Sequence, residues 1–255
     1  MSDLPSRASE PACPKVFVLI ASAGIGSRAV QPGGSGHLPK QYQLLCGQAV
    51  ILHTLEVFRS LPDVVEAVAV AVAPQDEFIA PLLGGRPEVI LRCGGANRAD
   101  TVRQGLQDWQ QMPAGPRPHD WVLVHDAARC LTEPSLVRRL IAQCGADPVG
   151  GLLALPLPDT LKTEQGGRVA QTLDRTGKWL AQTPQMFRCG ALFEALQRAR
   201  ASALPVTDEA SAMEALGLAP MLVPGSVRNF KITYPEDFSL AQALLQGQSA
   251  SAPST

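Results

Sequence analysis

Seven residues able to bind a charged ligand stand at or near the ends of apolar stretches in this 255-residue chain. They are Arg28, Lys40, Asp126, Arg129, Thr183, Thr207 and Lys231. Basic residues outnumber acidic ones in this set, so a site built from them favours a polyanion. The sequence shows no Ser-His-Asp arrangement, paired catalytic carboxylates or histidine cluster that would indicate another chemistry.

The stretch from Val16 to Lys40 supplies the first two of these charges. Residues 16–20 are a continuous apolar run, which predicts a strand buried on both faces. Residues 21–26 carry only small side chains except Ile25, so backbone N–H groups can approach an anion closely. Arg28 and Lys40 then add positive charge, with no acidic residue between them. This combination suits a triphosphate.

Other interpretations of this glycine-containing turn stay open from the segment alone. The third glycine of a dinucleotide-binding Gly-x-Gly-x-x-Gly motif is absent, because Ala29 or Val30 occupies its place. No Gly-Lys-Ser/Thr follows, so the turn is not a P-loop. A tight turn between a strand and a helix, without any ligand, fits the segment as well as a phosphate site does.

Composition excludes several classes of function. The net charge of −1 gives no basic surface for nucleic acid or a membrane, and no apolar run approaches the roughly 20 residues of a bilayer span. The cysteines lack a Cys-x-x-Cys pair, so we expect them to be reduced in a cytoplasmic protein. They are Cys13, Cys46, Cys93, Cys130, Cys144 and Cys189. Residues 1–14 lack the apolar core of a secretory signal, and we expect both 1–14 and 246–255 to be disordered tails.

Between these tails, alternating strand and helix patterns predict one α/β domain over residues 15–245. We expect a Rossmann-like, mostly parallel sheet with helices on both faces. Strands are predicted at residues 16–20, 67–72, 88–91, 121–124, 150–155, 220–223 and 229–233. Helices are predicted at residues 49–58, 75–83, from 98 onward, 133–143, 190–201, 208–216 after an N-cap at Thr207, and from 235 onward.

Two further segments end strands with residues that could contact a ligand. Residues 93–97 form a second small-residue turn, and the helix beginning at Arg98 would direct backbone N–H groups at an anion. The strand at 121–124 runs into Asp126 and Arg129, and ligands of open α/β sheets bind beyond such carboxyl ends. A purely structural Asp126 that caps the next turn is the alternative.

The alternation breaks at residues 156–182. Two short alternating runs flank Gly166 and Gly167, which predicts a β-hairpin. Such an insertion has little core of its own, so we expect an arm that projects and packs on another surface, such as a second subunit.

The order of several motifs resembles that of 2-C-methyl-D-erythritol 4-phosphate cytidylyltransferases over residues 15–245. The motifs are Ala23-Gly24-Ile25-Gly26-Ser27-Arg28, Pro39-Lys40-Gln41-Tyr42, Gly94-Gly95, Arg98-Ala99-Asp100-Thr101-Val102, Val124-His125-Asp126-Ala127-Ala128-Arg129, Asp159-Thr160-Leu161-Lys162, Asp174-Arg175, Thr183-Pro184-Gln185, Thr207-Asp208-Glu209-Ala210 and Lys231-Ile232-Thr233. The resemblance implies transfer of the cytidylyl group of CTP to 2-C-methyl-D-erythritol 4-phosphate, with release of pyrophosphate, in isoprenoid precursor synthesis.

The resemblance also implies roles for individual residues. Catalytic residues would be Arg28, Lys40, Arg175 and Lys231. Nucleotide-binding residues would be Ala21, Ser22, Ala23, Gly24, Gly26, Gly95, Arg98 and Thr101. Substrate-binding residues would be Asp126, Ala127, Arg129, Thr160, Arg175, Thr183, Thr207 and Lys231. Mg²⁺ would be held mainly by the CTP phosphates, with few direct protein ligands and no metal-binding residue assigned. The arm would exchange within a homodimer and bring Thr160 and Arg175 to the partner's substrate.

The sequence departs from the family pattern at several positions. Ser27 replaces the first arginine of a pair, Ala96 replaces an acidic residue, Ala21-Ser22 replaces Pro-Ala, and Cys130 replaces a proline. The loop at residues 29–39 is longer than usual, and the entropy of ordering it predicts weak CTP binding. The alternatives are a ribitol-phosphate or other pentitol-phosphate cytidylyltransferase, an inactive nucleotide-binding relative and, less favoured, a dehydrogenase.

Overall fold

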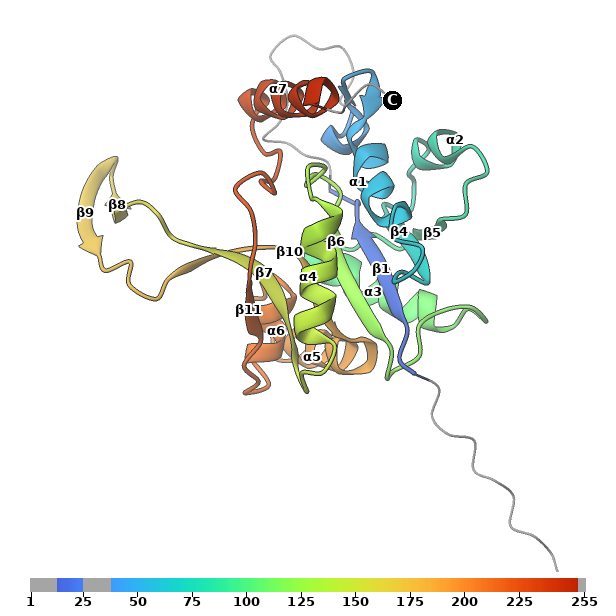
Figure 1. Ribbon diagram of the computed structural model, residues 1–255. Coiled ribbons are helices and arrows are strands. Elements are labelled where there is room, and N and C mark those ends of the chain that lie inside the picture. The colour runs from blue at the N-terminus through green and yellow to red at the C-terminus, as the bar shows by residue number, and fades with distance from the viewer. Residues whose placement is uncertain (1–12, 25–37, 252–255) are drawn as a thin grey trace, which may run out of the picture.

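The computed structural model describes residues 13–24 and 38–251, with side chains given up to residue 247. A seven-stranded sheet forms its centre, in the order β11-β7-β10-β6-β1-β4-β5 (Figure 1). The strands are β1 (Val16–Ala21), β4 (Ala67–Val72), β5 (Val89–Arg92), β6 (Trp121–Asp126), β7 (Gly150–Pro156), β10 (Trp179–Arg188) and β11 (Met221–Pro224). Only β10 runs antiparallel to its neighbours, so the predicted mostly parallel sheet is confirmed.

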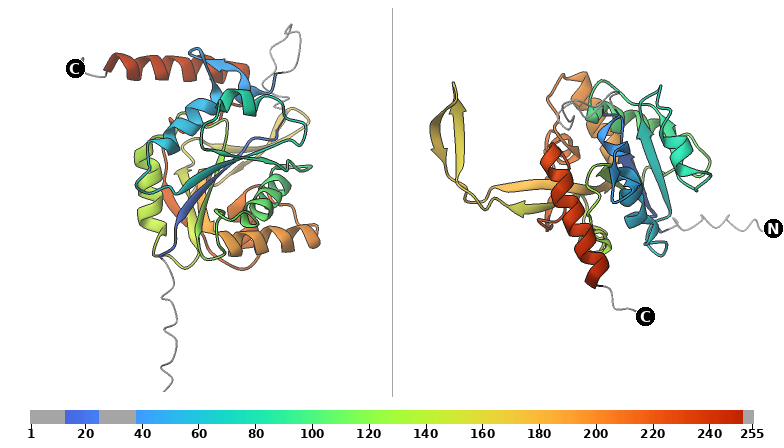
Figure 2. Two further views of the ribbon diagram at one scale, coloured as in Figure 1. Left: turned by 90° about the vertical axis from the view of Figure 1, so that its right-hand side faces the viewer. Right: turned by 90° about the horizontal axis from the view of Figure 1, so that it is seen from above.

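Helices cover both faces of this sheet (Figures 1 and 2). One face packs on α1 (Val50–Arg59), α2 (Ile79–Leu83) and α4 (Pro134–Cys144), and the other on α3 (Arg98–Gln110), α5 (Cys189–Ala201) and α6 (Glu209–Glu214). Alternation along β1 explains the division, because Val18 and Ile20 join the first core while Phe17 and Leu19 join the second. All four side chains are almost completely buried, as expected for a central parallel strand.

A smaller third core lies near the carboxyl ends of the strands. There α7 (Pro235–Ser251) packs on Leu45, Val50 and Leu131. The short elements η2 (Lys40–Tyr42), β2 (Leu44–Leu45) and β3 (Gln48–Ala49) lead the chain from this region into α1. Because α7 continues to Ser251, the backbone of 246–251 is helical where we expected the C-terminal tail to begin.

The predicted hairpin projects away from the sheet (Figures 1 and 2). Its strands β8 (Leu161–Gln165) and β9 (Arg168–Leu173) pair antiparallel in a separate two-stranded sheet. Gly166 and Gly167 make the turn with φ angles of 61° and 76°, a backbone conformation that favours glycine. Most of the hairpin's side chains are exposed, so this chain alone gives it little packing.

Three of the local predictions are wrong. The helix predicted from residue 75 begins only at Ile79, because the Asp76 side chain accepts hydrogen bonds from the N–H groups of residues 78 and 79. Asp208, rather than Thr207, is the N-cap of α6. No strand forms at 229–233; the N–H of Ile232 instead donates to the carbonyl of Ala128. Within the described ranges, no helix is long and apolar enough to cross a lipid bilayer.

Candidate active site

A cleft of about 470 Å³ opens at the carboxyl ends of β1 and β6. The two ends lie side by side because Ala21 is opposite Asp126 in the parallel register. The cleft is lined by Ala21, Ser22, Ala23, Gly24, Lys40, Gln41, Gly95, Ala96, Asn97, Arg98, Thr101, Asp126, Ala127, Ala128 and Lys231. The position agrees with the general location of ligands in open α/β sheets.

The two small-residue turns predicted from the sequence meet in this cleft. A Cβ atom on Gly94 would lie 2.6 Å from the Cβ of Ala23, so only glycine lets the turns approach this closely. Beside them α3 begins at Arg98, with the Asn97 side chain accepting a hydrogen bond from the N–H of Asp100 at 2.8 Å. The N-terminus of α3 therefore faces the same space as the first turn, which favours a bound anion.

Residues 40–42 hold the first turn in place. The amide Nε2 of Gln41 donates to the carbonyl oxygens of Ser22 and Gly24, at 2.9 and 3.0 Å. The neighbouring Lys40 Nζ donates to the carbonyl of Ile232 at 2.8 Å. The side chain of Gln41 is thus a positioning group for the phosphate-binding turn. Of this motif, the sequence predicts a role in the site only for Lys40.

Asp126 lies at the centre of a cluster of basic side chains. Its Oδ1 is 2.8 Å from Arg98 Nε, and its Oδ2 is 3.0 Å from Lys231 Nζ and 3.5 Å from Arg129 Nε. Burial alone would raise the pKa of Asp126, but the charges of Arg98, Lys231 and Arg129 outweigh burial and hold that pKa well below its usual range. The carboxylate is therefore ionised at neutral pH, and it holds Arg98 and Lys231 in the cleft and Arg129 behind it.

Arg98 has a second carboxylate partner, Glu209 at the start of α6. The two residues form a bidentate pair, with Nη1–Oε1 and Nη2–Oε2 distances of 2.6 and 3.0 Å. Burial would lower the pKa of Arg98, but Glu209 and Asp126 raise it overall, so the guanidinium stays charged. Burial raises the pKa of Glu209, and the charge of Arg98 partly opposes that rise.

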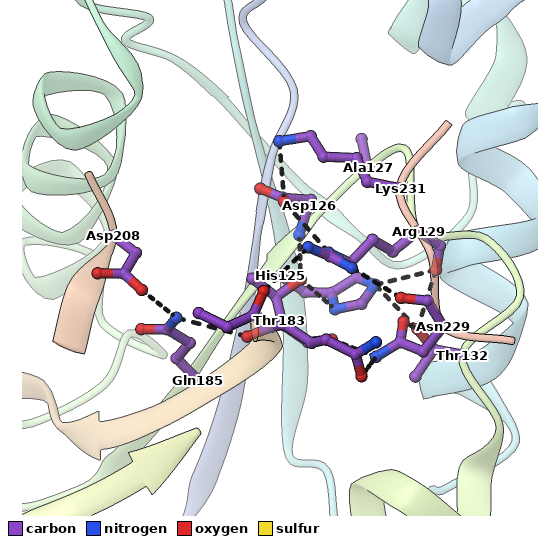
Figure 3. Close-up of polar contacts among 12 residues, drawn as sticks. His125, Asp126, Ala127, Arg129, Thr132, Thr183, Gln185, Asp208, Asn229 and Lys231 are labelled. Atoms are coloured by element: carbon purple, nitrogen blue, oxygen red, sulfur yellow. Dashed lines mark hydrogen bonds and ion pairs between the residues drawn. The ribbon is translucent and has the colours of Figure 1, made fainter. Parts of the chain in front are cut away.

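Behind Asp126, a buried polar network fixes the loop that follows β6 (Figure 3). His125 Nε2 is 3.2 Å from the carbonyl of Arg129, and His125 Nδ1 is 3.1 Å from Thr183 Oγ1. A carbonyl only accepts, so Nε2 carries the hydrogen and Nδ1 accepts from the Thr183 hydroxyl. That hydroxyl in turn accepts from the N–H of Asp126 at 3.1 Å. Thr183 therefore orients Asp126, the carboxylate that the basic side chains contact.

Asn229 joins the same network to the segment that carries Lys231. Its side-chain Nδ2 donates to the backbone carbonyl of Thr183 at 2.9 Å. The backbone carbonyl of Asn229 accepts from Arg129 Nη1 at 2.7 Å. Asn229 is completely buried. These bonds hold the irregular segment 229–233 against the site without a strand, which is why the predicted strand is not needed to place Lys231.

The structure brings most of the predicted site residues together. Those on the cleft are Ala21, Ser22, Ala23, Gly24, Lys40, Gly95, Arg98, Thr101, Asp126, Ala127 and Lys231. Arg129 and Thr183 contact Asp126 from behind the lining. Thr160 and Arg175 are exposed on the arm, and Thr207 is exposed before α6, so these three do not line the cleft of their own chain. Gly26, Arg28 and the loop at 29–39 lie outside or mostly outside the described residues.

Three residues with clear structural roles in the site escaped the sequence analysis: Gln41, Glu209 and Asn229. Gln41 and Glu209 stood inside motifs that carried the resemblance, and this was the available signal. Their partners lie 17 to 111 positions away along the chain, so local spacing gives no indication of the contacts. Asn229 had no such signal.

A doubly wound sheet with a cationic, small-residue cleft at its strand ends defines an α/β enzyme of the nucleotidyltransferase class. A family model for IspD, 2-C-methyl-D-erythritol 4-phosphate cytidylyltransferase, matches residues 16–247. A protein of that name from Bordetella pertussis is 49% identical over 231 residues, covering 90% of this chain and 98% of its own length. The chain belongs to the IspD family.

Two further relatives show how the similarity is distributed. The bifunctional enzyme IspD/IspF of Albidiferax ferrireducens is 52% identical over 252 residues; the match covers 98% of this chain and 58% of that protein. The crystal structure of the cytidylyltransferase from Thermus thermophilus superposes with a TM-score of 0.74 at 33% identity, covering 91% of this chain and 99% of the other. The chain thus spans almost the whole length of a single-function relative and somewhat more than half of the bifunctional one.

Proposed function

We propose that this chain transfers the cytidylyl group of CTP to 2-C-methyl-D-erythritol 4-phosphate. The observation that carries the proposal is the group of basic side chains around Asp126, beside two small-residue turns. The lining carries three positive charges, of Lys40, Arg98 and Lys231, against the one negative charge of Asp126. Arg129 and Glu209, one charge of each sign, lie directly behind it. A cleft with this balance suits two phosphorylated reactants, which repel one another in water.

The reaction needs positioning more than proton transfer. An ionised phosphate oxygen of the polyol phosphate attacks the α-phosphorus of CTP, and the bond from that phosphorus to the bridging oxygen breaks as pyrophosphate leaves. The nucleophile is already deprotonated, so no general base is required. Lys40 and Lys231 flank the cleft, and we assign to them, with Arg28 from the sequence, the stabilisation of the negative charge on the reacting phosphates.

The hydroxyl of Thr101 supports selection of cytosine. It donates to the carbonyl of Asn97 at 3.0 Å and accepts from the N–H of Gly95 at 3.1 Å. Its one hydrogen is therefore used, and towards a ligand the oxygen can only accept. The exocyclic amino group of cytosine is a donor, whereas uracil carries a carbonyl acceptor at that position. We infer that Thr101 favours CTP over UTP.

The described side chains of the site favour a divalent cation that is bound through the nucleotide. Within the described ranges, no group of three or more His, Cys, Asp or Glu side chains could hold a metal ion. Asp126 is already surrounded by three basic side chains. We propose that Mg²⁺ binds mainly through the CTP phosphates, where it would neutralise charge on the triphosphate.

We propose a homodimer in which each arm reaches the neighbouring subunit. The arm carries exposed apolar side chains, with Val169 66% and Leu180 47% accessible, which favour burial against a partner. A second cavity, of about 420 Å³, lies at the base of the arm and is lined by Trp179, Leu218 and Leu222 among others. In the dimer, Thr160 and Arg175 would bind the phosphate of the polyol in the partner's cleft.

We place the protein in the cytoplasm, in agreement with its six free cysteines.

The identity of the polyol is tested by phosphorus NMR of the products. Purified protein with CTP and Mg²⁺ is given 2-C-methyl-D-erythritol 4-phosphate or ribitol 5-phosphate in separate reactions. The proposal predicts paired diphosphate resonances of a cytidine diphosphate ester, together with pyrophosphate, from the first substrate. Turnover of ribitol 5-phosphate with none of the methylerythritol phosphate would show a pentitol-phosphate cytidylyltransferase instead.

A further inference from the structure

Glu209 is a completely buried carboxylate at the first position of α6. It is not among the residues that line the cleft. Both of its oxygens bind the guanidinium of Arg98, at 2.6 and 3.0 Å. A buried ion pair adds little net stability compared with apolar residues of similar volume, so folding stability alone does not explain this pair beside the cleft.

Arg98 links Glu209 to the cleft. Its Nη1 and Nη2 atoms are held by Glu209, and its third nitrogen, Nε, donates to Asp126 Oδ1 at 2.8 Å. The other Asp126 oxygen is 3.0 Å from Lys231 Nζ. The four side chains thus form a row of alternating charge that leads from α6, through the N-terminus of α3 and the end of β6, to Lys231.

This row restricts what Arg98 can do. A guanidinium is planar and rigid, so a bidentate partner on one edge fixes the direction in which the remaining N–H points. With Glu209 in place, that direction is towards Asp126. Glu209 also neutralises the charge of Arg98. Without Glu209, the full charge of Arg98 would attract the Asp126 carboxylate in addition to the charges of Lys231 and Arg129. The orientation of Asp126 therefore depends on a residue outside the cleft.

We propose that Glu209 is a positioning residue for the reaction: through Arg98 it fixes the Asp126 carboxylate, which accepts hydrogen bonds from the hydroxyls of the polyol phosphate. This inference rests on the proposed function, and it assigns Arg98 to the polyol side of the site more than to the nucleotide. It predicts that loss of the Glu209 charge weakens use of the polyol phosphate and lowers kcat, while the KM for CTP changes little.

The test is a double-mutant cycle in steady-state pyrophosphate release. Glu209→Gln, Arg98→Met and the E209Q/R98M pair are compared with the unaltered chain, with both substrates varied. We expect E209Q to lower kcat/KM for the polyol phosphate by about tenfold or more, with KM for CTP within about threefold. If Glu209 acts through Arg98, E209Q in the R98M background costs nothing further.

The matched control is Glu194→Gln on α5, which removes the same charge from an exposed Glu–Arg pair. We expect it to leave both KM values and kcat within about twofold. Three results would overturn the proposal: E209Q activity within twofold of the unaltered chain, losses that add in the double variant, or a rise in KM for CTP with none for the polyol phosphate.

A variant that fails to fold does not remove the test. In R98M/E209M no uncompensated charge stays buried, so its thermal unfolding is compared with that of R98M. Equal kcat/KM in R98M and R98M/E209M supports the proposal, and a further drop in the pair contradicts it. Failure of the proposed function and failure of this proposal give different results. Turnover by the unaltered chain tests the proposed function. The role of Glu209 is tested by the ratio of kcat/KM between variants, measured with the substrate pair that the unaltered chain uses, or by the ratio of calorimetric dissociation constants.

Discussion

At the scale of single residues, His125 shows how a buried side chain links the site to folding stability. Burial lowers its pKa to about 3 from an ordinary value of 6.5. The ring packs edge-on against Phe58, with centroids 5.1 Å apart, and lies between Arg129 and Thr183. The native protein therefore keeps a neutral imidazole at a pH where the unfolded chain binds a proton.

This difference predicts how stability changes with pH. Because the unfolded state binds the extra proton below pH 6.5, the free energy of unfolding falls as the pH drops from 6.5 towards 3. Between pH 7.5 and pH 5 the His125 contribution to this loss is about 2 kcal/mol. Denaturant unfolding of His125→Asn and of the unaltered chain at both pH values measures it, since the variant lacks this part of the pH dependence.

The control for that measurement is His119→Asn, which changes an exposed histidine. Because H119N keeps His125, we expect it to retain the loss of stability that His125 causes between pH 7.5 and pH 5. An H125N variant whose stability falls between pH 7.5 and pH 5 as steeply as that of the unaltered chain would show that His125 is not the group responsible.

Thr101 gives a prediction on nucleotide choice. Replacing it with valine removes the oxygen that we expect to accept from the cytosine amino group, and leaves the N–H of Gly95 without this partner. We expect Thr101→Val to lower kcat/KM for CTP by about tenfold or more, with a smaller effect on UTP. The ratio of the two nucleotides, measured in one preparation, provides its own control. An unchanged CTP/UTP ratio would assign the selection to other groups.

At the scale of elements, α6 joins the site through its N-terminus. Asp208 accepts from the N–H of Ser211 at 3.0 Å, and Ser211 Oγ accepts from the N–H of Asp208 at 3.2 Å, which completes a capping box. Gln185 of β10 adds a second attachment, since it donates to Asp208 and accepts from the N–H of Ala210. The helix that presents Glu209 is thus fixed at the end nearest the cleft.

Removal of this cap has a predictable cost. We expect Asp208→Ala to lower the free energy of unfolding by about 1 to 2 kcal/mol, because the N-terminal N–H groups lose their acceptor. Chemical denaturation measures the change. Asp108→Ala, at an exposed position late in α3, is the control and should stay within about 0.5 kcal/mol of the unaltered chain. Equal stability of D208A and D108A would contradict the capping role.

The elements also show how far the sequence could predict this structure. Apolar runs located the central strands well, because burial on both faces leaves a continuous pattern that does not depend on long-range contacts. The strand predicted at 229–233 is wrong, because the apolar residues of this segment pack against α7 and the loop after β6 instead of pairing in a sheet. Asp208, and not Thr207, is the cap because its side chain accepts from the N–H of Ser211, and its contact with Gln185 on β10 is one that the sequence alone does not show.

The candidate site divides in the same way. Small residues and charges at strand ends were identifiable, because the carboxyl edge of a parallel sheet is a general location for ligands. Gln41 and Glu209 were not, because each acts on a partner brought close only by the folded chain. Which cations gather around Asp126 is likewise a property of the assembled sheet.

At the scale of the whole molecule, the arm completes either the cleft of its own subunit or that of a partner subunit. Thr160 and Arg175 are exposed on an arm that projects from the sheet (Figure 1). If arms exchange in a dimer, Lys231→Ala and Arg175→Ala damage different sites, since Lys231 acts in its own subunit and Arg175 in the partner. A mixed dimer of these two variants then contains one cleft with both residues intact.

Complementation measures this directly. Differently tagged K231A and R175A chains are produced together and the mixed dimer is purified. We expect about half the activity of the unaltered dimer from it, while each variant alone has little. Absence of recovery in a dimer of confirmed composition would mean that the arm serves its own chain or no cleft.

We propose that one cationic cleft brings CTP together with a polyol phosphate. Pyrophosphate release, measured with CTP, ATP, GTP and UTP, each with and without 2-C-methyl-D-erythritol 4-phosphate and Mg²⁺, tests it most directly. We expect release with CTP that depends on the polyol phosphate, and far slower release with the other nucleotides. No release with CTP, or release from purine nucleotides at a rate equal to that with CTP, would contradict it.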